Sequence, residues 1–165
     1  EELIKLAFQK SPLPILVALD SIQDPQNLGA IIRSAEALGI HGIILPKNRT
    51  STINETVAKC SSGAIEYLPI SWVTNLTRGI EQLKEAGFWI AGIVPDGNTP
   101  CYQHKFDEPM VLVIGGEEKG IRPLLKKSCD VTLKIPMEGS LESLNASAAA
   151  AVIFYETLRQ KNMRS

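Results

Sequence analysis

Three segments of this 165-residue chain combine residue types that bind ligands and move protons. They are residues 24–29 (DPQNLG), 115–120 (GGEEKG) and 135–145 (IPMEGSLESLN). Their glycines let the backbone approach a ligand closely, and their amide, hydroxyl and carboxylate groups donate or accept hydrogen bonds. The last two segments follow strand-like apolar runs, and loops beyond the carboxyl ends of strands commonly bind small molecules. We therefore predict that these two loops share one pocket.

The segment 24–29 opens a predicted helix whose two polar side chains allow more than one interpretation. Asn27 is either a helix N-cap or part of an anion site at the helix start, where backbone N–H groups are unpaired. Arg33 lies opposite the apolar stripe of this helix, between the small residues Ala30 and Ala37. Small neighbours allow another molecule to approach the arginine. This favours a subunit interface or an RNA phosphate over simple exposure to solvent.

Ser143 and Asn145 are predicted to begin the last helix, one as its cap and one within its first turn. Their side chains would then project towards the loop 115–120. Capping alone is the simpler interpretation of both residues. A functional site is favoured because three polar sets, around Asn27, Glu117 and this pair, each lie at a junction between a strand and a helix.

Several other chemistries lose support. The segment 115–120 is not a G-x-G-x-x-G sequence and has no phosphate-loop lysine and hydroxyl pair, which argues against nicotinamide chemistry and nucleotide hydrolysis. His41 and His104 lie near turns without acidic or cysteine partners, so we expect neither to be catalytic. The cysteines are odd in number and widely spaced, which indicates no disulfide framework, no metal site and a reducing cytoplasm. They are Cys60, Cys101 and Cys129.

The elements that must position these residues alternate between strand and helix. Nearly continuous apolar runs typical of buried parallel strands cover residues 15–19, 42–45, 89–94 and 110–114, with weaker candidates at 66–69 and 131–134. Helical spacing is found in residues 28–38, 74–86 and 144–158, and short helices are expected near 53–61 and 123–128. This alternation predicts a single α/β domain with a parallel sheet covered on both faces.

The charge balance limits how the chain could bind nucleic acid. A formal net charge of −1 argues against coating RNA through bulk electrostatics, so any RNA contact must be local. One basic cluster could supply it, while a second, in the tail, is better explained as a solvated helix face. No apolar run approaches the roughly 18 residues of a membrane helix. The clusters are Lys119, Arg122, Lys126 and Lys127, and Arg159, Lys161 and Arg164.

Three ordered stretches of the chain resemble a known family. Residues 24–45 (DPQNLGAIIRSAEALGIHGIIL), 112–121 (LVIGGEEKGI) and 133–151 (LKIPMEGSLESLNASAAAA) are similar to motifs 1, 2 and 3 of the SpoU/TrmH RNA 2′-O-ribose methyltransferases. The resemblance implies the SPOUT fold, a parallel α/β sheet whose C-terminal part forms a trefoil knot, and a homodimer. Sequence periodicity alone predicts no knot.

The resemblance also implies a cofactor and roles for individual residues. S-adenosylmethionine would bind among the loops of motifs 2 and 3, and the catalytic set would come from all three motifs. The implied cofactor-binding residues are Gly115, Gly116, Ile135, Met137, Gly139 and Leu144, and the implied catalytic residues are Asn27, Arg33, Glu117, Ser143 and Asn145. The family mechanism makes the arginine the base, although a guanidinium is almost always protonated. In the alternative, Arg33 grips a phosphate while Glu117 or water takes the proton.

The expected reaction is methyl transfer to the ribose 2′-hydroxyl of a guanosine in large-subunit ribosomal RNA. The alternatives are transfer to a tRNA ribose and a non-catalytic RNA-binding module of the same fold. We expect residues 1–12 to be a linker or the tail of a missing N-terminal module, and residues 13–165 to be the catalytic domain. The expected partners are RNA and a second copy of the chain, with no membrane and no metal.

Overall fold

The structure, a computed structural model, describes residues 1–164 and is built on one parallel sheet. The described part holds seven strands in the order β3-β2-β1-β6-β4-β7-β5, and every pairing between them is parallel. The predicted α/β class with a parallel sheet is confirmed. The strands are β1 Ile15–Asp20, β2 Gly42–Pro46, β3 Ile70–Val73, β4 Trp89–Ile93, β5 Thr99–Pro100, β6 Met110–Gly115 and β7 Val131–Lys134.

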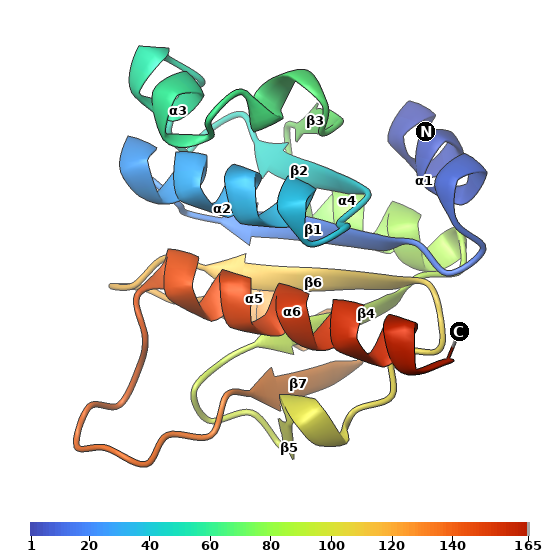
Figure 1. Ribbon diagram of the computed structural model, residues 1–165, viewed down its shortest axis with the longest axis vertical. Coiled ribbons are helices and arrows are strands. Elements are labelled where there is room, and N and C mark those ends of the chain that lie inside the picture. Colours follow the sequence, from blue (N-terminus) through green and yellow to red (C-terminus); the bar gives the residue numbers. More distant parts are fainter. Residues whose placement is uncertain (165) are drawn as a thin grey trace.

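Helices cover both faces of the sheet, as the continuous apolar strands require. Along β1, Val17 and Leu19 pack against α2 and α6, whereas Leu16 and Ala18 pack in a second core with α1, α4 and α5. Figure 1 shows α2 and α6 side by side in front of the sheet. The helices are α1 Glu2–Lys10, α2 Pro25–Ala37, α3 Glu55–Cys60, α4 Leu76–Glu85, α5 Pro123–Lys127 and α6 Ala146–Arg164, with short 3₁₀ turns η1 Ala64–Glu66 and η2 Cys101–Gln103.

One predicted strand was misplaced, and one strand was not predicted at all. The weak strand expected at 66–69 falls on η1 and the turn after it, and the strand lies instead at Ile70–Val73, where it pairs with β2. The 3₁₀ turn follows Gly63, whose φ of 83° reverses the chain before those residues could extend. The two-residue strand β5 had no sequence signal, because a strand this short has no periodicity to detect.

A long loop carries the chain from β7 to α6. β7 pairs with β4 and β5, whereas α6 packs with α2 beside β1 and β6, so residues 135–145 pass along the edge of the sheet between the two. Figure 1 shows this loop swinging wide of the sheet at the lower left. The knot implied by the family resemblance stays a prediction.

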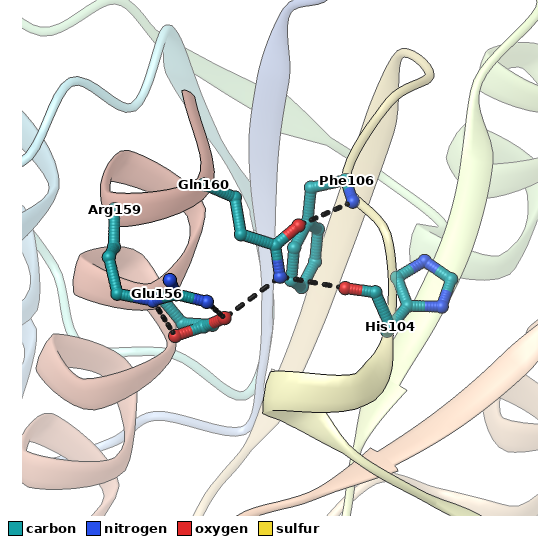
Figure 2. A network of polar contacts seen from close by, with 5 residues as sticks. All are labelled: His104, Phe106, Glu156, Arg159 and Gln160. Atoms are coloured by element: carbon teal, nitrogen blue, oxygen red, sulfur yellow. Dashed lines mark hydrogen bonds and ion pairs between the residues drawn. The ribbon is translucent and has the colours of Figure 1, made fainter. Parts of the chain in front are cut away.

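Polar contacts fix the far end of α6 to the segment that leads into β6 (Figure 2). The Gln160 side chain accepts from the Phe106 amide at 3.0 Å and donates to the His104 carbonyl at 2.8 Å. It also donates to Glu156, which accepts two hydrogen bonds from Arg159. These bonds from Arg159 hold the pKa of Glu156 below its ordinary value. The helix is thereby held in one register against the sheet.

The N-terminal helix packs on the domain. α1 lies within the first 12 residues of the chain and buries Leu3 and Ala7 in the second core. The expectation that these residues are a linker or the tail of another module stays a prediction. No helix within residues 1–164 combines the length and hydropathy needed to cross a membrane.

The two histidines predict how stability depends on pH. The Ile15 amide donates to Nδ1 of His41 at 3.0 Å, and burial lowers the pKa of both His41 and His104 below 6.5. The unfolded chain therefore binds protons more readily, so stability is full above pH 6.5 and falls as pH drops through the folded pKa values. We expect the free energy of unfolding, measured in urea, to decrease between about pH 7.5 and about pH 5.5.

The control for this prediction is His41→Asn, whose amide oxygen can still accept from the Ile15 amide. The variant should show a shallower loss of stability over the same pH range, because one of the two histidines of the chain has been removed. An unchanged slope would contradict the assignment to His41.

Candidate active site

The predicted site residues gather at the carboxyl edge of the sheet. β1 and β6 are neighbours that end together, with Asp20 paired to Gly115. The segments that follow the two strands, residues 21–29 and 116–121, therefore start side by side. This is the edge at which parallel α/β sheets bind ligands.

The loop 115–120 folds back tightly on itself. The Gly116 amide donates to the Asp20 carbonyl at 3.0 Å, and the Gly120 amide donates to the Gly116 carbonyl at 2.8 Å. A Cβ on Gly115 would overlap the backbone of Gly120 and Ile121, so this turn requires glycine at position 115. The glycine at the start of this segment thus has a steric cause.

An ion pair between the buried Asp20 and the partly exposed Arg122 fixes the end of this loop to β1. Asp20 is fully buried and accepts from the Arg122 backbone amide at 2.9 Å and from its Nε at 2.9 Å. Ser21 also donates to it, at 3.4 Å. A buried carboxylate needs such partners, so the pair holds the two segments in register.

Three of the predicted catalytic residues meet in a hydrogen-bonded set, which we call the active-site cluster: Asn27, Glu117 and Asn145. Asn145 Nδ2 donates to Asn27 Oδ1 at 3.2 Å and to Glu117 Oε1. The same carboxylate oxygen accepts from the Ala146 amide at 3.2 Å. The residues come from α2, from the loop after β6 and from the residue before α6, so distant segments of the chain build the cluster together.

Asn145 has two roles in the structure, because its side chain also caps α6. Its Oδ1 accepts hydrogen bonds from the Ser147 and Ala148 amides at 3.0 and 3.3 Å. The Ala146 amide donates instead to the carboxylate of Glu117. These bonds satisfy N–H groups that have no partner within the helix. The prediction that Ser143 and Asn145 begin the helix was therefore wrong in register, since the helix starts at Ala146 and Ser143 lies in the preceding loop.

A cavity of about 370 Å³, the first cavity, opens beside the cluster. Five of the six predicted cofactor-binding residues line it, and the exception is Gly139. Ser143 and Glu117 line it as well. We did not predict from the sequence that residues at the end of β4 would form one wall of this cavity. The predicted strand 89–94 ends at the same edge of the sheet and could have indicated it. The five residues are Gly115, Gly116, Ile135, Met137 and Leu144, and the missed wall is Ile93, Val94 and Pro95.

A second cavity, of about 730 Å³, adjoins the first. It is lined by the segment after β1, including Asn27, and by Arg49 and Arg122. The two cavities share a wall, residues 116–119 with Ala146, which includes Glu117. A ligand in each cavity would therefore meet the other at the active-site cluster.

Of the predicted catalytic residues, only Arg33 lies outside both the active-site cluster and the two cavities. Its side chain is exposed on α2, it lines neither cavity, and it makes no hydrogen bond or ion pair within residues 1–164. This leaves its side chain available to another molecule, as Ala30 and Ala37 beside it suggested.

Part of the predicted basic clusters is engaged within the fold. Arg122 pairs with Asp20, and Lys126 lies 3.5 Å from Asp96. In the tail, Arg159 pairs with Glu156, and Arg164 donates to the Phe106 carbonyl at 2.7 Å. Charge counted along the sequence therefore overstates the charge available to RNA.

Two of the three cysteines lie in surroundings that keep their thiols protonated. Burial raises the pKa of the Cys101 thiol, and it raises that of Cys129 to about 11, so both stay protonated and unreactive. Residues 1–164 hold no group of three or more histidine, cysteine or acidic side chains that could bind a metal ion.

Comparisons with known proteins agree with this geometry. Residues 14–155 match the SpoU rRNA Methylase family. The chain is 49% identical over 160 residues to an uncharacterised tRNA/rRNA methyltransferase of Synechocystis and 44% identical over 162 residues to a TrmH-family tRNA/rRNA methyltransferase of Bacillus subtilis. These matches cover 97% and 98% of the chain but 42% and 65% of the two relatives, so the chain spans only part of their length.

Solved structures share the fold. The SpoU methyltransferase AviRb of Streptomyces viridochromogenes, solved in complex with AdoMet, has a TM-score of 0.83 and 34% identity over 90% of this chain and 58% of its own. A TrmH/SpoU tRNA modifying enzyme of A. aeolicus has a TM-score of 0.84 and 26% identity over 99% of this chain and 84% of its own.

Proposed function

Because the chain belongs to the SpoU rRNA Methylase family, we propose that it transfers the methyl group of S-adenosylmethionine to the 2′-hydroxyl of a guanosine ribose in ribosomal RNA. The observation that carries this proposal is the shared wall of the two cavities. A methyl donor in the first cavity and a ribose in the second would face each other across Glu117.

The lining of the first cavity fits S-adenosylmethionine. Its volume of about 370 Å³ lies in the range of small-molecule sites. Ile135, Met137 and Leu144 offer apolar contacts to an adenine ring, and the backbone of residues 115–120 offers donors and acceptors to its edge. The carboxylate of Glu118, beside that of Glu117, favours a sulfonium cation.

The chain would have to orient the ribose and accept one proton. Bound S-adenosylmethionine supplies an electrophilic methyl group, and a C–O bond to the ribose forms as the C–S bond breaks. The hydrogen bonds of Asn145 to Asn27 and Glu117 fix the carboxylate where the two cavities meet. Such positioning supplies much of the acceleration of a displacement reaction.

Glu117 is the better placed of the two candidate bases. Its Oε1 is engaged by Asn145 and Ala146, while its Oε2 has no partner within residues 1–164 and is available to a hydroxyl proton. Arg33 lies outside both cavities, so it would act only on RNA that extends to it or on the site of a second subunit. We propose that the chain forms a homodimer in which Arg33 of each subunit acts at the site of the other subunit.

Calorimetric titration of the chain with S-adenosylmethionine tests the proposal. We expect binding with one site per chain, and transfer of a labelled methyl group from the cofactor to large-subunit ribosomal RNA transcripts. Absence of heat at millimolar cofactor would rule out the enzyme. Binding without transfer to any RNA would identify a non-catalytic RNA-binding module.

A tRNA substrate is the alternative within the same chemistry. One structural neighbour, with a TM-score of 0.82 and 26% identity, is described by its 2′-OH methylation of C/U34 on tRNA. Transfer to tRNA transcripts but not to ribosomal RNA would select this alternative. Either substrate would be met in the cytoplasm, where we propose that the chain acts with its three cysteines reduced.

A further inference from the structure

A third cavity continues the line of the first two along the carboxyl edge of the sheet. It has a volume of about 280 Å³ and lies where β2 and β3 end, between Pro46 and Thr74. The second cavity lies beyond β1 and β6, and the first lies beyond β6, β4 and β7. The order of the three cavities thus follows the order of the strands, and about three strand spacings of ~4.8 Å separate the outer two.

The third cavity has the lining of an anion site. The described residues around it include two arginines, Arg49 and Arg122, and no acidic side chain. Hydroxyl and amide groups supply further donors, from Asn48, Thr74 and Thr77. The second cavity differs, because carboxylates and cations both line it. A negative group would therefore prefer the third cavity.

Arg49 connects the third cavity with the second, since it lines both. Its backbone has a φ of 62°, a left-handed conformation that is uncommon for a residue with a side chain. The next two residues hold it there, because the Thr50 hydroxyl and the Ser51 amide both donate to the Ile22 carbonyl, at 3.0 and 2.9 Å. The loop after β2 is thereby tied to the segment after β1.

Arg122 and the start of α4 add donors around the same space. Asp20 engages the Nε and the backbone amide of Arg122, which leaves its Nη groups for a ligand. The Asn75 side chain caps the Arg78 amide, while Leu76 and Thr77, the first two residues of α4, line the cavity. Amides in the first turn of a helix have no acceptor within it and favour an anion.

We propose that Arg49 and Arg122 bind a backbone phosphate of the RNA close to the nucleotide that is methylated. The inference rests on the proposed function, because it places the target ribose in the second cavity and the neighbouring backbone in the third. Arg49 is then a positioning residue that sets the register of the RNA strand. It makes no contact with the first cavity, so cofactor binding does not depend on it.

The test is Arg49→Asn, because asparagine removes the charge and tolerates a left-handed backbone. We expect its affinity for a labelled large-subunit ribosomal RNA transcript, measured by filter binding, to fall about tenfold. The slope of log affinity against log salt should become shallower by about 1. The affinity for S-adenosylmethionine should stay within twofold of that of the wild type. Arg49→Lys should recover part of the loss.

Two further variants make the result specific. Lys105→Ala removes one positive charge at the opposite edge of the sheet, before β6, and should leave affinity and salt slope unchanged. Thr77→Glu places a carboxylate in the third cavity at the start of α4, where an acidic residue suits the helix. It should weaken transcript binding at least as much as Arg49→Asn, and it serves as the test if that variant fails to fold.

The outcomes separate this inference from the proposed function. It is overturned if Arg49→Asn and Thr77→Glu keep the affinity and salt slope of the wild type. It is also overturned if Lys105→Ala loses as much transcript affinity as Arg49→Asn, or if the wild type binds no transcript. A site that binds inorganic phosphate alone in calorimetry, with transcript binding unaffected by the variants, also overturns it. Failure of the proposed function is a different result, namely no S-adenosylmethionine binding or no methyl transfer by the wild type.

Discussion

Gly115→Ala is expected to lower the affinity of the chain for S-adenosylmethionine by about a hundredfold or more. The added methyl group would overlap the backbone of Gly120 and Ile121, so the loop must open to admit it. This loop is a wall of the first cavity and carries Glu117. Overpacking costs roughly 1–3 kcal/mol, and the upper end of that range, expected here because backbone must move, sets the size of the effect. Calorimetry with the cofactor measures it.

Gly139→Ala is the matched control for this prediction. Gly139 was also a predicted cofactor-binding residue, but a Cβ there would meet no atom within 4 Å, and the residue does not line the first cavity. Its affinity for the cofactor should equal that of the wild type. Equal losses in the two variants would contradict the steric explanation, and circular dichroism shows whether Gly115→Ala remains folded.

Arg33→Ala is expected to lower the rate of methyl transfer about a thousandfold and to leave cofactor affinity unchanged. The side chain lies outside the first cavity, so its loss cannot disturb the cofactor directly. Its proposed role is to hold the RNA or stabilise charge at the site of a second subunit. Arg78→Ala removes a guanidinium from α4, on the other face of the sheet, and should transfer at the wild-type rate.

Mixed subunits show where Arg33 acts. If the arginine serves the neighbouring subunit, mixing Arg33→Ala with Glu117→Ala restores one intact site in each mixed dimer, and about a quarter of the wild-type activity returns. No recovery would place its action within its own subunit. Unchanged transfer by Arg33→Ala alone would contradict any role in the reaction, and simultaneous loss of cofactor binding would point to a folding defect.

The strands were predictable where burial dictates their composition. The runs 15–19, 42–45, 89–94 and 110–114 are apolar because both faces of each strand are covered, and all four are strands in the structure. β3 was misplaced and β5 missed, because short strands near the edges of the sheet bury too little to leave a pattern. The strand order could not be predicted either, since it depends on which helices cross which face.

The candidate site was predictable where backbone geometry restricts residue type. Gly115 is present because no other residue fits there, and Asn145 because it caps a helix that the fold requires. Arg49 had no such signal, since a single arginine in a polar loop resembles any solvated residue. Its position between two cavities depends on how the loops after β1 and β2 pack together, which is a tertiary property.

The double role of Asn145 has a consequence for the order of folding. The side chain that starts α6 also completes the active-site cluster, and its partners Asn27 and Glu117 are 118 and 28 residues away along the chain. The cluster therefore cannot assemble before the start of α6 docks at the edge of the sheet, so competence to catalyse arises together with this helix.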